Sequence, residues 1–334
     1  MGVNTFIGSK WATIGAVVAV AAGGAVIATT AGGGSPAFPD ATSTGVPSGT
    51  TLTTYTGPTT ITTANTVIDS KTINGCLSIE AANVLVKNSK INCTSFADVT
   101  STACSCAVGL DDGPGYSSFS VTVQDSEVDC GGDPPNGFNN STAFGSAFIT
   151  VLRVNIHGCE NGFDVNQSVD IEDSYMHDLR QCDGTQCGGD GSHTDGLQTG
   201  AGHYSPPGSN TIANATLNIT IRHNTILSMK AGAPTDGTAA DSYFTTSAII
   251  TNGVCCDTNM VIDDNLLGGG AFTLYCEHNG IAFAGTSEVR RNHFTTRYRS
   301  TVGAFGPTSD CADEVTSGNV YDDGPNAGQP VPLD

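Results

Sequence analysis

A short recurring phrase constrains the fold of this chain more than any other feature of its sequence. Each copy has two apolar residues in alternation, a polar stretch containing Asn or Ser, one variable residue and a final apolar residue. Clear copies begin at Val84, Val121, Val169, Ile219, Met260 and Val289, and weaker copies cover residues 67–73, 151–156 and 315–320. Alternating apolar residues predict short strands, and a small polar residue between two strands predicts a bend at that residue.

The spacing of the recurring Asn or Ser distinguishes between β folds. It occurs at Ser89, Ser126, Ser174, Asn224, Asn265, Asn292 and Asn319, at intervals of 27 to 50 residues. Intervals of this size are typical of solenoid coils, whereas an antiparallel sandwich has no reason to repeat one strand-bend-strand phrase. We therefore predict an all-β parallel β-helix, a solenoid interrupted by long insertions at residues 93–118, 130–145, 179–216, 228–257, 268–287 and 297–314.

Alignment of the copies predicts which polar side chains lie side by side on neighbouring coils. One outward column contains Gln124, Glu172, Arg222, Asp263 and Arg290, and the next contains Asp125, Asp173, His223, Asp264 and Arg291. Such columns could form an anion-binding strip or a ladder of surface ion pairs. The alternation of charge favours the ladder.

The chain divides into four parts by composition. Residues 1–34 contain an uncharged Ala, Val and Gly-rich stretch after Lys10, which fits a cleaved signal peptide or an N-terminal membrane segment. Residues 35–54 are rich in Thr, Pro, Gly and Ser and predict an exposed linker. Residues 55–325 form the predicted β-helix domain, and residues 326–334 form a C-terminal tail.

Twelve cysteines follow the apolar stretch, and an even number in an exported chain predicts disulfides. A zinc site is the weaker interpretation, because the cysteine pairs lack a matching second CxxC motif. We expect Cys182–Cys187 to close a short loop and Cys276–Cys311 to join loops on neighbouring coils. The protein is then secreted and extracellular, or alternatively membrane-anchored or exposed on a virion surface.

The charge balance restricts the partners. Twelve Lys and Arg against 32 Asp and Glu give a formal net charge of −20, with no basic run. This charge repels nucleic acid, so we predict no nucleic-acid partner. A polyanionic polysaccharide would also be repelled unless cations or clustered arginines offset the field.

The richest candidate site lies in the insertion at residues 179–216. It contains Asp190, His193, Asp195, His203 and Tyr204 among many glycines. Carboxylates and imidazoles are the usual groups for acid–base chemistry, and insertions are where solenoids carry function. We expect His193 and Asp195 to share an exposed Gly-flanked turn, in which Asp195 either acts in a site or only caps the turn.

A second candidate cluster contains Phe272, Tyr275, Glu277 and His278, with residues 297–299 (RYR) and Phe305 expected nearby. Aromatic rings could stack on sugar faces while the polar side chains contact hydroxyl groups. Alternatively, these aromatic residues cover the end of the solenoid.

The residues 192–198 (SHTDGLQ), 273–276 (TLYC) and 318–323 (GNVYDD), together with the repeated phrase, resemble the pectin-lyase-like superfamily of right-handed parallel β-helices. The chain is most similar in this respect to exported β-helix proteins of actinobacteria and their phages. The resemblance implies a right-handed β-helix that acts on a polymeric glycan as a polysaccharide lyase or a glycoside hydrolase.

The resemblance also implies roles for individual residues. In polygalacturonase-like glycosidases an Asn-Thr-Asp-Gly turn supplies a catalytic aspartate, which corresponds to Asp195, with His193 in place of the Asn and Asp190 within reach. In pectate lyases, aspartates bind Ca²⁺ and an arginine acts as base. By analogy, Asp190, Asp195 and Asp241 would hold Ca²⁺, and His193, His203 or Arg222 would be the base.

The predicted substrate-binding residues are His203, Tyr204, Arg222, Tyr275, Glu277 and His278. The expected partner is a polysaccharide, and association with a cell envelope or a virion is compatible with the same features. The alternative function is a non-catalytic glycan-binding or structural module, such as a phage tail component or a surface adhesin.

Overall fold

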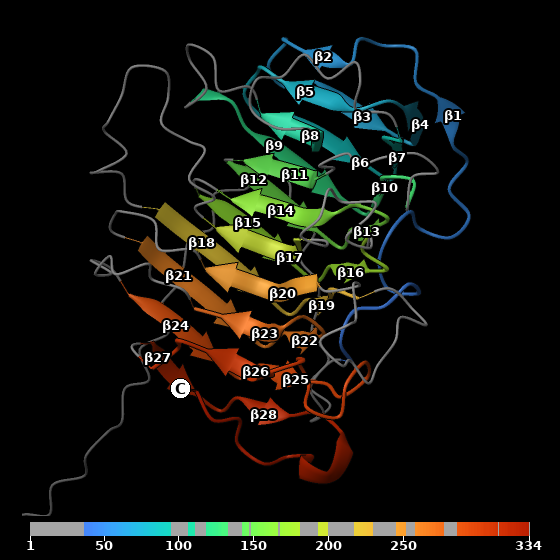
Figure 1. Ribbon diagram of the computed structural model, residues 1–334. Helices are drawn as coiled ribbons and strands as arrows, with labels where there is room; N and C mark the ends of the chain where they lie inside the picture. The colour runs from blue at the N-terminus through green and yellow to red at the C-terminus, as the bar shows by residue number, and fades with distance from the viewer. Residues whose placement is uncertain are drawn as a thin grey trace, which may run out of the picture. The chain divides into compact units, whose positions relative to one another are not determined.

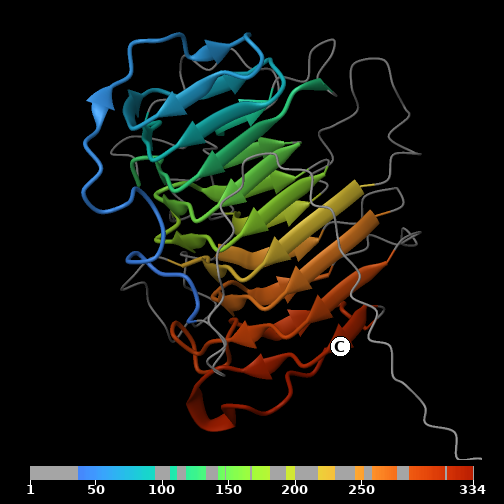
Figure 2. The same cartoon turned by 180° about the vertical axis from the view of Figure 1, so that it is seen from behind.

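The protein is a parallel β-helix. The computed structural model describes residues 37–94, 106–110, 118–132, 142–146, 148–165, 168–180, 193–199, 217–229, 245–251, 258–276, 286–312 and 314–333. Their strands form three sheets in which every neighbouring pair is parallel (Figure 1). The three sheets are called A, B and C, and their strands are given below. Along the chain, each coil contributes one strand to sheet B, then one to sheet C and then one to sheet A. Figure 2 shows the same stack of coils from behind. The predicted fold class is confirmed.

The three sheets contain the following strands. Sheet C consists of β3 (Val67–Asp69), β6 (Val84–Lys87), β9 (Val121–Gln124), β12 (Ile149–Leu152), β15 (Val169–Glu172), β18 (Leu217–Arg222), β21 (Thr258–Asp263), β24 (Ser287–Arg290) and β27 (Val315–Ser317). Sheet A consists of β1 (Thr53–Thr54), β4 (Lys71–Asn74), β7 (Lys90–Asn92), β10 (Glu127–Asp129), β13 (Asn155–His157), β16 (Tyr175–His177), β19 (Thr225–Leu227), β22 (Leu266–Gly268), β25 (His293–Phe294) and β28 (Val320–Tyr321). Sheet B consists of β2 (Thr60–Ile61), β5 (Leu77–Ile79), β8 (Cys106–Leu110), β11 (Thr142–Ser146), β14 (Asn161–Val165), β17 (Thr194–Thr199), β20 (Thr245–Thr251), β23 (Phe272–Tyr275) and β26 (Gly306–Ser309). A 3₁₀ helix, η2 (Gly324–Asn326), follows the last strand.

The repeated phrase corresponds to a sheet C strand, a bend and a sheet A strand. All nine copies are present, and their apolar positions pair in register, as Val84 does with Val121. The bend lies one residue earlier than predicted, at a residue in the left-handed conformation. These residues are Ser70, Asn88, Asp125, Arg153, Asp173, His223, Asp264 and Arg291, with φ between 49° and 56°, and Gly318, with φ of 68°. A single left-handed residue reverses side-chain direction locally, which turns the strand out of sheet C into sheet A.

At seven of the nine bends the next residue is a buried Ser or Asn, and these residues form a ladder between coils. The backbone N–H of Asn224 donates to Oδ1 of Asn265 at 2.9 Å, and that of Asn265 donates to Oδ1 of Asn292 at 3.0 Å. Each Asn amide also donates to a carbonyl of the preceding coil, as Asn265 does to Ile221 at 2.9 Å. The ladder therefore satisfies backbone groups that the bend removes from the sheets.

The segments predicted as insertions each contain a strand of sheet B. The strands β8, β17, β20, β23 and β26 lie within them, and β11 extends one residue beyond its segment. These strands are rich in Gly, Ala and Thr, so they lack the alternating Val and Ile that identified the other two sheets. The prediction of long loops in these segments was therefore wrong for the residues of sheet B.

Both ends of the predicted domain extend further than expected. From Phe38 onward the predicted linker packs on the solenoid: the Phe38 ring lies 5.9 Å from the His223 ring and 5.0 Å from the His293 ring. The N–H of Gly45 donates to the carbonyl of Arg153 at 3.0 Å. The C-terminal tail folds back so that Pro330 pairs with Val320, which covers the edge of sheet A.

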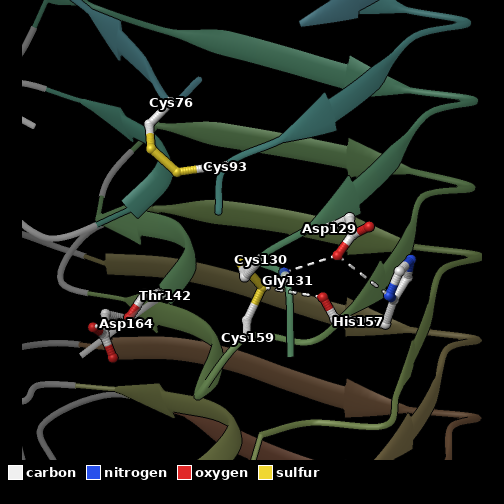
Figure 3. The surroundings of a disulfide bond; sticks show 9 residues. All are labelled: Cys76, Cys93, Asp129, Cys130, Gly131, Thr142, His157, Cys159 and Asp164. Atoms are coloured by element: carbon white, nitrogen blue, oxygen red, sulfur yellow. Dashed lines mark hydrogen bonds and ion pairs between the residues drawn. A yellow bond between two sulfur atoms is a disulfide. The ribbon is translucent and has the colours of Figure 1, made fainter. Parts of the chain in front are cut away.

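Among the cysteines that the structure describes, three pairs form disulfides between neighbouring coils: Cys76–Cys93, Cys130–Cys159 and Cys276–Cys311. The first two lie where the chain leaves sheet A, one above the other in Figure 3. Their Cα atoms are 4.8 or 4.9 Å apart, which matches the spacing of adjacent strands and falls within the range that a disulfide requires. The predicted Cys276–Cys311 pair is confirmed, and such bonds are typical of exported proteins. Within the described residues, no helix has the length and apolar character needed to cross a membrane.

Removal of one inter-coil disulfide should lower stability without changing the fold. In the variant with Cys130→Ala and Cys159→Ala, the free energy of unfolding should fall by about 3 to 4 kcal/mol, because the bond closes a loop with a sequence separation of 29. Urea unfolding followed by circular dichroism measures this change. An unchanged midpoint would show that the ladder and the core alone hold these coils together.

A carboxylate and aromatic face on sheet B

Asp195 lies on strand β17, not on the exposed turn that the sequence predicted. A Cβ atom on the next residue, Gly196, would lie 2.3 Å from Cγ2 of the core residue Ile226, so Gly196 faces the core. The following residue, Leu197, is also a core residue, so β17 does not alternate regularly here, and the position of Asp195 is given by its contacts. Its N–H donates to Oδ1 of Asn161 on β14 at 2.9 Å, and its side chain is buried, with 2% of the residue exposed.

The surroundings of Asp195 favour its protonated form. Burial raises its pKa well above the usual aspartate value, and the negative charges of Asp164 and Glu160 raise it further. The Ser247 hydroxyl donates to Oδ1 of Asp195 at 2.5 Å and opposes the shift only in part. This carboxyl group therefore keeps its proton to a higher pH than an exposed aspartate does.

Asp164, on the adjacent strand β14, is held as a hydrogen-bond acceptor. It accepts from the Thr142 hydroxyl at 2.8 Å, from the Gln198 amide at 2.6 Å and from the Asn161 amide at 3.3 Å. Figure 3 shows Thr142 and Asp164 facing one another beside the Cys130–Cys159 disulfide. Two neighbouring carboxyl groups thus occupy different environments, one buried and one held by three donors.

Aromatic side chains continue the same face toward the C-terminal coils. The register runs from Asp164 to Gln198, Ile250 and Tyr275 on successive strands. The ring of Tyr275 lies 5.6 Å from that of Phe272, which lies 5.8 Å from the ring of Phe305. Phe305 is 67% exposed. The expected nearness of Phe305 to Phe272 is confirmed, and Gln198 and Ile250 separate Tyr275 from Asp164 in this row. The expected nearness of Tyr298 to this cluster was wrong, because Tyr298 packs with Leu227 and Met229.

The remaining predicted site residues fall into two groups. His193 is exposed and immediately precedes β17, whereas Arg222 lies on sheet C, away from this face, and pairs with Glu172. The others lie outside the described residues: Asp190, His203, Tyr204, Asp241, Glu277, His278 and the pair Cys182–Cys187.

Four residues at this site were not predicted from the sequence: Asp164, Gln198, Glu160 and Ser247. Asp164 occurs in the segment Asn161–Val165, whose Gly162 and Phe163 do not alternate with polar residues in the way that a half-buried strand requires. One sequence signal could have revealed Asp164. The segment Gly162-Phe163-Asp164 resembles Gly196-Leu197-Gln198, and the two segments pair in the register of β14 and β17.

The predicted ladder of ion pairs is present on sheet C and its bends. Arg222 pairs with Glu172, Arg290 with Asp263 at 3.2 Å, and Arg291 with Asp263 at 2.5 Å. In the column of bend residues, Arg153 pairs with Asp125 at 2.6 Å. These arginines are already paired with carboxylates, so the interpretation as an anion-binding strip loses its support.

Sheet A carries one group of side chains in the described chain that could hold a metal ion. Ligand atoms of Glu127, Asp129 and His157 lie within 4.8 Å of one another, because Asp129 pairs directly with His157 in the register. The Lys90 ammonium already lies 2.8 Å from Glu127 and 3.5 Å from Asp129. A hydrogen bond from His157, together with Lys90, lowers the pKa of Glu127 to about 2. The Lys90 ammonium is therefore the cation that already pairs with the carboxylates of Glu127 and Asp129.

The ion pair between Lys90 and Glu127 should stabilise the folded protein at neutral pH and should lose this effect in strong acid, where Glu127 is protonated. The Glu127 pKa is about 2 in the folded state and about 4.5 when unperturbed, so its stabilising effect is complete above pH 4.5 and is lost as the pH falls toward 2. Lys90→Met should therefore cost about 1 kcal/mol at pH 6 and little at pH 2. Denaturant unfolding at both pH values tests this, with Lys71→Met as control, since Lys71 bonds to the Thr53 hydroxyl. An equal loss of unfolding free energy at both pH values would show that the effect of Lys90→Met does not come from its ion pair with Glu127.

Comparison with known proteins yields no relative. No family model matches this sequence, no curated protein matches it, and no solved structure matches the fold. The functional interpretation therefore depends on the geometry of the chain itself.

Proposed function

We propose that this protein is an exported glycoside hydrolase that binds a polymeric glycan along the outer face of sheet B. The observation that carries the proposal is the nearness of the buried Asp195, whose pKa is raised in part by the charge of Asp164, to that hydrogen-bonded carboxylate on the adjacent strand. In the register of sheet B, the row that contains Asp164 continues to Tyr275, whose ring lies next to that of Phe272. Glycoside hydrolysis requires two carboxyl groups with different ionisation, and aromatic rings commonly stack on sugar faces.

The two carboxyl groups suit the two roles of this reaction. Asp195 would donate its proton to the oxygen of the scissile glycosidic bond, because its raised pKa keeps the proton available. Asp164 would act on the anomeric side, either by activating water or by direct attack. Since Asp195 is buried, the proposal requires that glycan binding makes its carboxyl group accessible.

Membership of the pectin-lyase-like superfamily is part of the proposal. It is supported by the parallel β-helix fold. Hydrolysis is favoured over elimination, because a carboxyl group that retains its proton is a poor ligand for Ca²⁺. The predicted Ca²⁺ ligands Asp190 and Asp241 remain a prediction, as does association with a cell envelope or a virion.

The second candidate is a non-catalytic glycan-binding module, and the burial of Asp195 favours it. A residue with 2% exposure, hydrogen-bonded to Ser247, could serve the packing of β17 and β20 alone. The aromatic row of Phe272, Tyr275 and Phe305 would then bind the glycan without chemistry.

A screen of the full-length protein on plant, algal and bacterial polysaccharides separates these functions. Release of reducing ends without absorbance from unsaturated uronates is the expected result. Unsaturated products would show a lyase and contradict the role given to Asp195. Binding without any product would establish the glycan-binding module, and no binding to any polymer would reject both.

A further inference from the structure

The strands β14 and β17, which carry the two carboxyl groups, share one irregularity. In each strand the two middle residues of a four-residue segment face the core, and the segments are residues 161–164 (NGFD) and 195–198 (DGLQ). In β14, two consecutive core residues place Asn161 and Asp164 on the same side of the strand, although they are three positions apart. Asn161 can therefore reach both Asp164 on its own strand and Asp195 on the next.

Asn161 contacts both carboxyl-bearing residues with the two ends of one amide group. Its Oδ1 accepts from the N–H of Asp195 at 2.9 Å, and its Nδ2 donates to Oδ1 of Asp164 at 3.3 Å. A backbone N–H can only donate, so the first bond identifies which end of the amide is the oxygen, and the other end is then a donor toward Asp164. The amide group is planar, so the two bonds together set the position of Asp195 relative to Asp164.

The chain around Asn161 is itself held in place by neighbouring coils. Asn161 begins β14, two residues after Cys159, which forms a disulfide with Cys130. The N–H of Arg180 donates to the carbonyl of Cys159 at 2.7 Å, and the carbonyl of Arg180 accepts from the Thr194 hydroxyl at 2.7 Å. The backbone of Arg180 therefore joins the residues before β14 to the first residue of β17, and Figure 3 shows the disulfide in this region.

We propose that Asn161 is a positioning residue for glycan hydrolysis, in which its amide group sets the arrangement of Asp195 relative to Asp164. This inference rests on the function proposed above and adds a residue that acts through the two carboxyl groups. Hydrolysis by two carboxyl groups depends on their separation across the scissile bond. Gln198 donates to Asp164 and Ser247 donates to Asp195, so loss of either would disturb one carboxyl group, whereas loss of Asn161 would disturb both.

Two variants at this position test the inference. Asn161→Ala removes both hydrogen bonds and should lower kcat by about 10- to 100-fold, with KM unchanged within about threefold, because the carboxyl groups lose their arrangement and the rest of the binding face is kept. Asn161→Asp keeps an acceptor for the N–H of Asp195 but adds a negative charge to those of Asp164 and Glu160. It should raise the pKa of Asp195 further, so the alkaline limb of the pH–rate profile should move to higher pH.

Asn155→Ala is the matched control. Asn155 lies on β13 of sheet A, where its Oδ1 is 2.8 Å from Nε2 of His177, and its loss should change neither kcat nor the pH–rate profile. Rates are taken per folded molecule, with folding followed by circular dichroism. If the native protein cleaves a glycan and Asn161→Ala cleaves it at the native rate, the inference is overturned and the hydrolase proposal stands.

Two further outcomes would also overturn the inference alone. An unchanged alkaline limb in Asn161→Asp would show that residue 161 does not act on Asp195. An equal fall in kcat in Asn155→Ala and Asn161→Ala would show a general loss of packing. If the native protein cleaves no polymer, the proposed function fails and the role of Asn161 fails with it.

Discussion

Replacing Asp195 by asparagine is expected to lower the rate of glycan cleavage by about 10²- to 10⁴-fold, the usual effect of losing a general acid. Asparagine has nearly the same shape as a protonated aspartate and can still accept the hydrogen bond from Ser247. The loss of rate should therefore not be accompanied by a loss of folded protein. Turnover per folded molecule, on whichever polymer the native protein cleaves, is the measurement.

The same substitution should raise stability at neutral and alkaline pH. Because the folded-state pKa of Asp195 is raised, its contribution to stability is fully present below the unfolded pKa and is lost as the pH rises through the folded pKa. Asparagine does not ionise, so the variant should match the native protein at pH 3 and exceed it at pH 8. Denaturant unfolding at the two pH values gives the comparison.

Asp170→Asn is the matched control for this experiment. Asp170 is a half-buried aspartate on sheet C whose pKa is also raised by burial, but it lies away from the proposed site. This variant should change stability in the same direction and leave turnover unchanged. If Asp195→Asn cleaves glycan at the native rate, Asp195 is a structural residue and the hydrolase proposal fails.

Replacing Gly196 by alanine is expected to destabilise the protein by about 3 kcal/mol or more. The added Cβ would lie 2.3 Å from Cγ2 of Ile226 and 2.4 Å from the carbonyl oxygen of Ala248. The second contact is with backbone of the adjacent strand, so the clash cannot be relieved by a side-chain rotation. Thermal and urea unfolding measure the loss.

Gly132→Ala provides the comparison for this prediction. Gly132 has φ of +70°, and a Cβ there would have no neighbour within 4 Å. It should cost about 1 kcal/mol, through backbone conformation alone. Equal losses in the two variants would show that sheets B and A are not packed tightly around Gly196.

Sequence reasoning identified sheets C and A because their strands alternate Val or Ile with polar residues around a constant bend. It could not identify sheet B, where strands such as Thr194–Thr199 contain small residues that pack against the opposite sheets instead of following a two-residue period. Asp195 was therefore assigned to a turn, whereas it lies on β17.

The pairing of side chains across coils was predictable where the repeated phrase fixes the register. The ion-pair column and the Cys276–Cys311 bond followed from it. The cluster of Glu127, Asp129 and His157 was accessible by the same alignment, since Val128 pairs with Ile156. In contrast, the burial of Asp195 depends on three-dimensional packing that no spacing along the chain reveals.

The placement of the disulfides between successive coils affects what a protease can do to this molecule. A single cut in the connection between Cys130 and Cys159 would leave both fragments covalently joined, and each fragment would keep its neighbours in all three sheets. The same holds for a cut between Cys276 and Cys311. Nicked protein should therefore migrate as one species until it is reduced, so damage to the loops need not release any coil from the stack.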